Sequence, residues 1–103
     1  MYKIEYQSAA QQDMINIVSY ISHHLHNPIA AERLANAFIA EMEKLSEFPY
    51  SMPMYYPIRP LKYEYRKLIV KNHIMFYRVD EQRKTIIVAR VIYAKSDYIQ
   101  KLK

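Results

Sequence analysis

Apolar residues recur at steps of three and four in two segments of the first half of the chain. The first segment contains Met14, Ile17, Val18, Ile21 and Leu25. The second contains Ala31, Leu34, Ala35, Phe38, Met42 and Leu45. This spacing puts each set on one face of a helix, so the pattern predicts two amphipathic helices. Because so few residues separate them, we expect the helices to fold back as an antiparallel hairpin.

Polar residues mark the expected start of each helix. Ser8, followed three residues later by Gln11, has the spacing of a capping box. Asn27 is a favourable N-cap, and Pro28 suits the first turn that follows it. The sequence therefore predicts one helix from Ser8 to Leu25 and a second that begins after Asn27.

Four segments have the pattern of strands, namely residues 2–6, 65–71, 73–79 and 85–93. We expect a tight turn at Asn72, because asparagine tolerates the left-handed conformation, and a charged turn at residues 80–84. Residues 48–62 hold four of the five prolines and predict a stiff, irregular connector.

The resulting order, β-α-α-β-β-β, predicts an α+β fold with one domain over residues 1–103. Strands joined by short turns form an antiparallel meander, and the helical hairpin must bury its apolar stripes against one face of that sheet. We expect the other face to be left open, with the basic residues and tyrosines of the meander available on it.

The composition excludes most familiar enzyme signatures. The 103 residues include neither cysteine nor glycine. Without cysteine there is no disulfide, thiolate metal site or thiol nucleophile, and without glycine there is no phosphate-binding loop or dinucleotide fingerprint. No apolar run approaches the length of a membrane span, and the N-terminus lacks the apolar core of a signal peptide. We therefore expect a cytoplasmic protein without a cofactor or a metal.

Charge is divided unevenly along the chain. Residues 1–53 carry three basic and six acidic side chains, a balance of −3, whereas residues 54–103 carry twelve and four, a balance of +8. Seven of the eleven tyrosines also lie in the second part. Basic and aromatic residues together suit a polyanion such as RNA, since cations neutralise phosphates and rings stack on bases. The alternative is a solvated basic face with half-buried tyrosines.

Several residues of the second half suit cleavage of RNA without a metal, which needs a base, an acid and cations on the developing charge. The candidate catalytic residues are Arg66, Lys67, Arg90, Tyr93 and His73, and the candidate substrate-binding residues are Lys71, Lys95, Tyr98 and Tyr65. Strand alternation places Arg66 and Lys67 on opposite faces, and Arg90 on the face of Ile86, Val88 and Ile92. An arginine among such neighbours either pairs with a carboxylate or contacts a ligand.

An ordered set of motifs spans nearly the whole chain: DMINIVSYI at 13–21, NPIAA at 27–31, LSEFP at 45–49, YRKL at 65–68, NHIMFYRV at 72–79 and ARVIYAKSDY at 89–98. In this order and spacing they resemble the RelE/ParE superfamily, the toxins of type II toxin–antitoxin modules. The resemblance implies a small toxin fold, with two helices packed on a mostly antiparallel four-stranded sheet. It also implies a cognate antitoxin as partner.

The resemblance allows two mechanisms. RelE-like members are ribosome-dependent, metal-independent mRNA endonucleases that use basic residues and a Tyr or His. ParE-like members share the fold but poison DNA gyrase. Where RelE-like members carry arginines early in the second meander strand and just past the last strand, this chain has Ile74 and Ser96. The motifs carry over Arg66, Lys67 and Arg90, and more loosely Tyr93, Lys95 and Tyr98.

The first prediction is a toxin that cleaves mRNA on the ribosome. In it Arg66, Lys67 and Arg90 hold phosphate, and Tyr93 or His73 takes part in proton transfer or stacking. The alternative is a ParE-like inhibitor of DNA gyrase without RNase activity. A further alternative is a non-catalytic module that binds RNA or an acidic protein.

Overall fold

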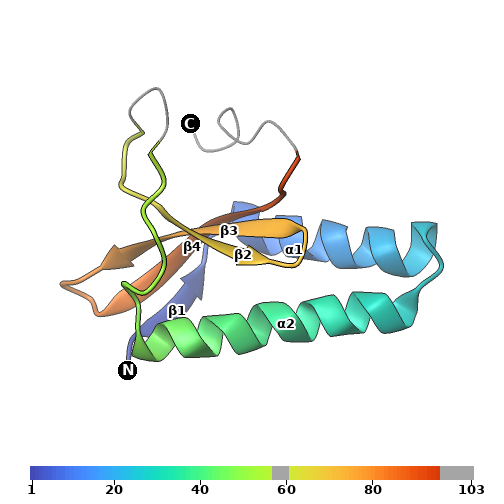
Figure 1. Ribbon diagram of the computed structural model, residues 1–103, viewed down its shortest axis with the longest axis horizontal. Helices are drawn as coiled ribbons and strands as arrows, with labels where there is room; N and C mark the ends of the chain where they lie inside the picture. Colours follow the sequence, from blue (N-terminus) through green and yellow to red (C-terminus); the bar gives the residue numbers. More distant parts are fainter. Residues whose placement is uncertain (57–60, 96–103) are drawn as a thin grey trace.

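Two helices pack against one face of a four-stranded sheet in the computed structural model, which describes residues 1–56 and 61–95 (Figure 1). The elements are β1 (Lys3–Tyr6), α1 (Ser8–Ser19), η1 (Tyr20–His24), α2 (Pro28–Glu47), β2 (Arg66–Val70), β3 (His73–Asp80) and β4 (Thr85–Tyr93). The strand order is β1-β4-β3-β2, with β1 parallel to β4 and the other neighbours antiparallel. The predicted α+β class, element order and mostly antiparallel sheet are confirmed.

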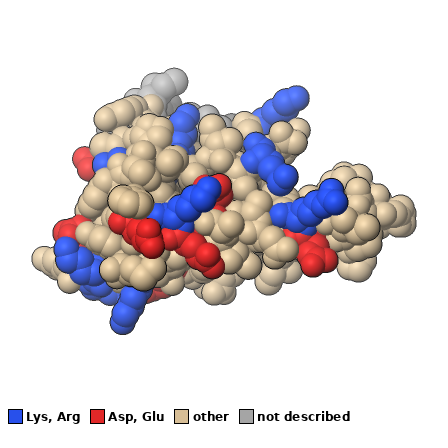
Figure 2. Space-filling view, turned by 60° about the horizontal axis from the view of Figure 1, so that its bottom comes forward, with Lys and Arg blue, Asp and Glu red and all other residues tan. Residues whose placement is uncertain are grey.

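The helical hairpin turns through η1, a short π-helix. A continuous α-helix to Leu25 was expected, but α-helical bonding ends at Ser19, and the Leu25 N–H donates to the Tyr20 carbonyl at 3.1 Å. This wider turn stacks the rings of Tyr20 and His24, with centroids 5.3 Å apart. Residues 14–31 contain no Lys, Arg, Asp or Glu. The end of the hairpin therefore forms the uncharged lobe that extends past the sheet in Figures 1 and 2.

The two α-helices begin differently. Asn27 caps α2 as predicted, because its Oδ1 accepts the Ala30 N–H at 3.1 Å. The capping box predicted at Ser8 is wrong: Ser8 is already helical, and no side chain caps α1. The preceding Gln7 is extended and donates its N–H to the Val88 carbonyl at 3.0 Å. Strand pairing, and not a cap, therefore determines where α1 begins.

The main core lies between α2 and the sheet. It joins Leu34, Phe38, Met42 and Leu45 of α2 to alternate strand residues, which are Leu68, Val70, Met75, Tyr77, Ile86, Val88 and Val91. In α1 only Ala10 is fully buried, and the predicted stripe from Met14 to Ile21 is half-buried. The second helix therefore supplies most of the packing against the sheet.

The sheet face opposite the helices is covered and not open, contrary to the prediction. Its buried residues Ile74, Phe76, Ala89 and Ile92 form a second apolar cluster with Tyr65. Tyr55 and Leu61, which lie before Pro57 and after Pro60 in the connector, pack against this cluster. The near-continuous apolar runs of β3 and β4 explain the difference, because such runs are typical of strands buried on both faces.

A β-bulge interrupts the alternation of β4. Phe76 pairs with Arg90, but the next residue, Tyr77, pairs with Val88, so Ala89 is the extra residue. The three residues predicted to share a face with Arg90 therefore do not share one: Ile86 and Val88 lie in the main core, whereas Ile92 lies in the second cluster.

Among the described residues, left-handed backbone occurs at His26, Lys71 and Lys84, with φ of 51°, 54° and 48°. Asn72 was expected to take this conformation, but it falls on the preceding Lys71. The Asn72 carbonyl accepts the Ala94 N–H at 2.9 Å, which ties the β2–β3 turn to the end of β4. Each such residue costs about 1 kcal/mol of conformational energy.

Candidate functional site

Arg90 lies at the edge of β4, where β1 has ended and α1 takes its place. Asp13 of α1 accepts hydrogen bonds from Arg90 Nε and Nη2, both at 2.7 Å, and from the Val91 N–H at 2.9 Å. The side chains are 24% and 14% exposed, and the hydrogen bond to Asp13 raises the pKa of Arg90. Of the two roles predicted for Arg90, the structure therefore assigns it the carboxylate pair. Asp13 also satisfies a strand N–H that β1 no longer reaches.

Arg66 holds the connector. Its Nη1 donates to the Met52 carbonyl at 2.7 Å and to the Tyr50 carbonyl at 3.4 Å, and its guanidinium carbon lies 5.1 Å from the centre of the Tyr50 ring. The neighbouring Lys67 bonds the connector through its backbone, with its N–H on the Pro53 carbonyl at 3.1 Å. The predicted pair thus anchors the connector along the edge of β2.

His73 and Tyr93 lie together at the other end of the sheet. They are partners in the β3–β4 register, and their ring centroids are 5.8 Å apart. Burial lowers the pKa of His73, whose Nδ1 has no hydrogen-bond partner. The two rings line a pocket of about 750 Å³ beside η1, with Asn16, Ile17, Tyr20, Ile21, Leu25 and Asn72. Among the described residues, no lysine or arginine lines this pocket.

The remaining predicted residues are scattered. Tyr65 is buried in the second cluster, and burial raises its pKa. Lys71 is exposed in the β2–β3 turn, and Lys95 is exposed after β4. Tyr98 and the departure at Ser96 lie outside the described residues. The structure therefore brings together His73 and Tyr93, but not these two with Arg66 or Arg90.

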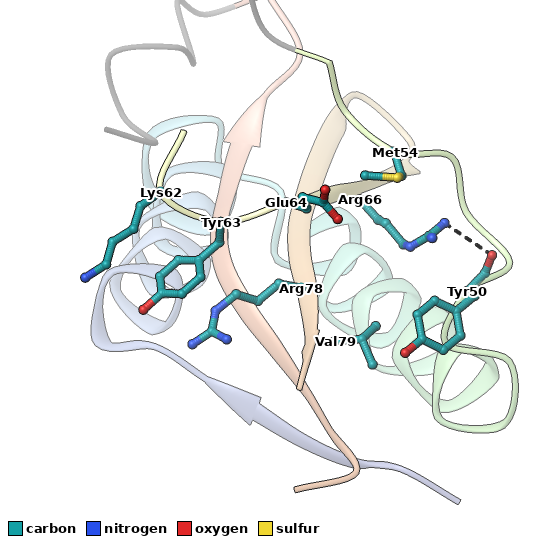
Figure 3. A pocket seen from close by; sticks show the side chains of 8 residues that line it. All are labelled: Tyr50, Met54, Lys62, Tyr63, Glu64, Arg66, Arg78 and Val79. Atoms are coloured by element: carbon teal, nitrogen blue, oxygen red, sulfur yellow. Dashed lines mark hydrogen bonds between the residues drawn. The ribbon is translucent and has the colours of Figure 1, made fainter. Parts of the chain in front are cut away.

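A different pocket gathers cations and tyrosines where the connector meets β2 and β3 (Figure 3). Its volume is about 330 Å³, and it is lined by Tyr50, Met54, Lys62, Tyr63, Glu64, Arg66, Arg78 and Val79. The guanidinium carbon of Arg78 lies 4.1 Å from the centre of the Tyr63 ring, and Lys62 Nζ lies 5.4 Å from it. We call this site the Arg78 pocket.

Two contacts hold the connector wall of the Arg78 pocket. Glu81 of the β3–β4 turn accepts hydrogen bonds from Tyr50 and Lys84, and from Tyr2 at 2.7 Å. The bonds from Lys84, Tyr50 and Tyr2 lower the pKa of Glu81 to about 2, and the bond to Glu81 raises the pKa of Tyr50 to about 12. Tyr77, buried below, donates to the Pro49 carbonyl at 2.8 Å.

Arg78, Lys62 and Tyr63 were not among the candidates named from the sequence. A signal was present, since Arg78 lies in an apolar strand, as Arg90 does. Lys62 and Tyr63 belong to the irregular segment before β2, for which a pattern predicts no position.

Among residues 1–56 and 61–95, no three His, Asp or Glu side chains come close enough to hold a metal ion. No helix within these ranges combines the length and apolarity that a membrane crossing requires.

Residues 4–98 match the family described as the ParE toxin of the type II toxin-antitoxin system parDE. The chain belongs to the ParE toxin family. This match covers almost the whole chain, including the hairpin and all four strands. No curated protein matches the sequence of this ParE-family chain.

Solved structures share the fold of this ParE-family chain at low sequence identity. The match to the chromosomal ParDE system of P. aeruginosa has a TM-score of 0.72 and a sequence identity of 16%. It covers 92% of this chain and 98% of the matched chain. The match to the E. coli RelBE complex has a TM-score of 0.59 and an identity of 13%, and it covers 93% of this chain and 100% of the matched chain. The match to RelBE2 of Mycobacterium tuberculosis has a TM-score of 0.55 and an identity of 18%, and it covers 89% of this chain and 96% of the matched chain. The superfamily assignment made from the motifs is confirmed.

Proposed function

We propose that this toxin arrests growth by inhibiting DNA gyrase and that a cognate antitoxin restrains it. The family match supports the toxin role. Poisoning of gyrase is the mechanism that the resemblance implies for ParE-like members. The complexes among the similar folds, ParDE and RelBE, support an antitoxin partner.

The pairing of Arg90 with Asp13 is the observation that favours gyrase over mRNA. In the RNase prediction, Arg66 and Arg90 hold phosphate. Here Arg90 has a bidentate carboxylate, and Arg66 donates to the connector carbonyls. Recruiting either one for phosphate would leave a half-buried acceptor without its donor, which costs about 1–3 kcal/mol. Gyrase inhibition needs no catalytic cluster, so it is compatible with engaged cations.

A second candidate, mRNA cleavage, rests on His73 and Tyr93. Burial lowers the pKa of His73, so the imidazole is neutral at pH 7 and can accept a proton. Tyr93 lies beside it and could stack on a base or donate a proton. Against this candidate, the described residues that line their pocket include no lysine or arginine to stabilise the developing charge.

One paired experiment separates the proposals. Purified toxin is added to a gyrase supercoiling reaction and, separately, to a translation reaction in which mRNA ends are mapped. We expect loss of supercoiling with intact mRNA. Codon-positioned cuts that disappear in His73→Ala, with gyrase unaffected, would replace our proposal with mRNA cleavage. If both reactions are unaffected and expression leaves growth unchanged, the chain is a binding module and not a toxin.

A further inference from the structure

Two cations lie close to one aromatic ring, that of Tyr63, in the Arg78 pocket. Arg78 reaches the Tyr63 ring from β3, and Lys62 reaches it from the end of the connector (Figure 3). Stacking on the ring holds the planar guanidinium in a fixed orientation. An arginine held in this way is pre-organised to bind a planar anion with little further loss of side-chain entropy.

Arg90 and Arg78 differ in their acceptors: Arg90 binds a carboxylate, and no described carboxylate pairs with Arg78. Arg90 directs Nε and Nη2 at the two oxygens of Asp13. The Nε of Arg78 is buried without a hydrogen-bond partner. Among the described residues, no Asp or Glu forms an ion pair with Arg78, although Glu64 lines the same pocket. Half-buried guanidinium groups are normally satisfied. The buried Nε is out of reach of a ligand, so an acceptor from outside would meet the terminal N–H groups of Arg78, which lines the pocket.

We propose that the Arg78 pocket binds a carboxylate carried by an acidic peptide segment of a partner protein. The terminal N–H groups of Arg78 match the two oxygens of a carboxylate, and Lys62 adds a second positive charge. Met54 and Val79 line the same pocket and offer apolar contact to the residues beside the acid. The volume of about 330 Å³ suits one side chain and the adjoining backbone.

Glu64 favours a peptide over a nucleic acid. Its exposed carboxylate lines the pocket, so a strand with a phosphate on every nucleotide would bring a second negative charge near it. A peptide can present a single acid to Arg78 while a backbone N–H donates to Glu64. The inference concerns a site that the gyrase proposal does not use, so either can fail alone.

An NMR titration of the intact toxin tests the site. The probe is a blocked pentapeptide with one central aspartate, and its twin carries asparagine there. We expect the aspartate peptide to shift the Arg78 Nε–H signal saturably and to bind about tenfold more tightly than the twin, the difference of one charge-assisted contact. Equal affinities, or the absence of a saturable shift, would overturn the proposal. Tighter binding of a thymidine dinucleotide at the same signal would assign the pocket to nucleic acid instead.

Variants locate the effect. Arg78→Gln should abolish the difference between the twins, and Arg78→Lys should retain part of it. Glu64→Gln should tighten the aspartate peptide about twofold, because a repelling charge is removed. Arg83→Gln is the matched control, since Arg83 is exposed and paired with Glu5 at 2.7 Å. If Arg83→Gln weakened binding as much as Arg78→Gln, general charge attraction would replace a site. Unchanged dispersion of the backbone amide signals shows that each variant is folded.

Discussion

Arg90 and Arg78 are half-buried arginines on neighbouring strands, but their surroundings differ. Arg90 lies at the β4 edge beside α1, where Asp13 takes both its Nε and an Nη. Arg78 faces the connector, where it meets a ring and a lysine but pairs with no described acid. Residue type and burial therefore do not distinguish a structural arginine from one available to a ligand. The presence of a nearby acceptor distinguishes the two kinds of arginine.

The Asp13 pair should carry the largest stability effect. Asp13→Ala removes the acceptors of Arg90 and of the Val91 N–H, so we expect the free energy of unfolding in urea to fall by about 3 kcal/mol. Asp13→Asn keeps one acceptor and should lose less. Adding Arg90→Met to Asp13→Ala should restore part of the loss, because the uncompensated charge is removed. A loss below about 1 kcal/mol for Asp13→Ala would show that the pair is not structural.

Tyr77→Phe should loosen the wall of the Arg78 pocket without touching its cations. The variant leaves the Pro49 carbonyl without its buried donor, so we expect a loss of about 1–2 kcal/mol in urea unfolding. Limited proteolysis should cut within the connector sooner than in the wild type. Tyr50→Phe, which removes an exposed bond to Glu81, is the comparison and should cost less. Equal losses would mean that burial does not decide the strength of these bonds.

His73 also has a buried nitrogen without a hydrogen-bond partner among the described residues, and its effect should appear as a pH dependence. Burial lowers the pKa of the folded state below the ordinary 6.5, so the unfolded chain takes up this proton first as the pH falls. Stability is therefore complete above pH 6.5 and declines below it. Urea titrations between pH 7.5 and 5.5 should show this decline, and His73→Leu should flatten it. A decline that His73→Leu leaves intact would belong to other groups, although not to Glu81, whose pKa of about 2 lies far lower.

Arg78→Gln should have the smallest effect on folding. No described carboxylate pairs with Arg78, so we expect a change within about 0.5 kcal/mol, against about 2 kcal/mol for Arg90→Gln. Parallel urea curves for the two variants provide the measurement. Similar losses would remove the distinction between the two arginines and make Arg78 a structural residue.

Local signals predicted the elements well where the chain itself supplies the contact. The apolar stripe of the second helix, the cap at Asn27 and the strand at residues 85–93 are confirmed, because each depends on neighbours within a few positions. The cap at Ser8 was wrong, and the turn predicted at Asn72 is present but has its left-handed residue at Lys71. At both places a backbone hydrogen bond joins residues that are distant in the sequence. These bonds connect Gln7 to Val88 and Ala94 to Asn72.

The site predictions depended on strict alternation and on an open sheet face. A bulge at Ala89 interrupted the alternation of β4, and the connector residues Tyr55 and Leu61 covered the sheet face that was expected to be open. Neither has a local signature in this chain. As a result the sequence named Arg66 and Arg90, which the fold engages, and missed Arg78, which it leaves without an acceptor.

The sequence alone determined the order of elements, the α+β class and the toxin superfamily, because periodicity and motif spacing are local properties of the chain. Only the tertiary structure decided which cations are engaged. Asp13 lies 77 residues before Arg90, and Tyr63 meets Arg78 from a connector without a repeating pattern. Contacts of this kind exist only after the strands have paired, since they depend on register, on a bulge and on the path of the connector.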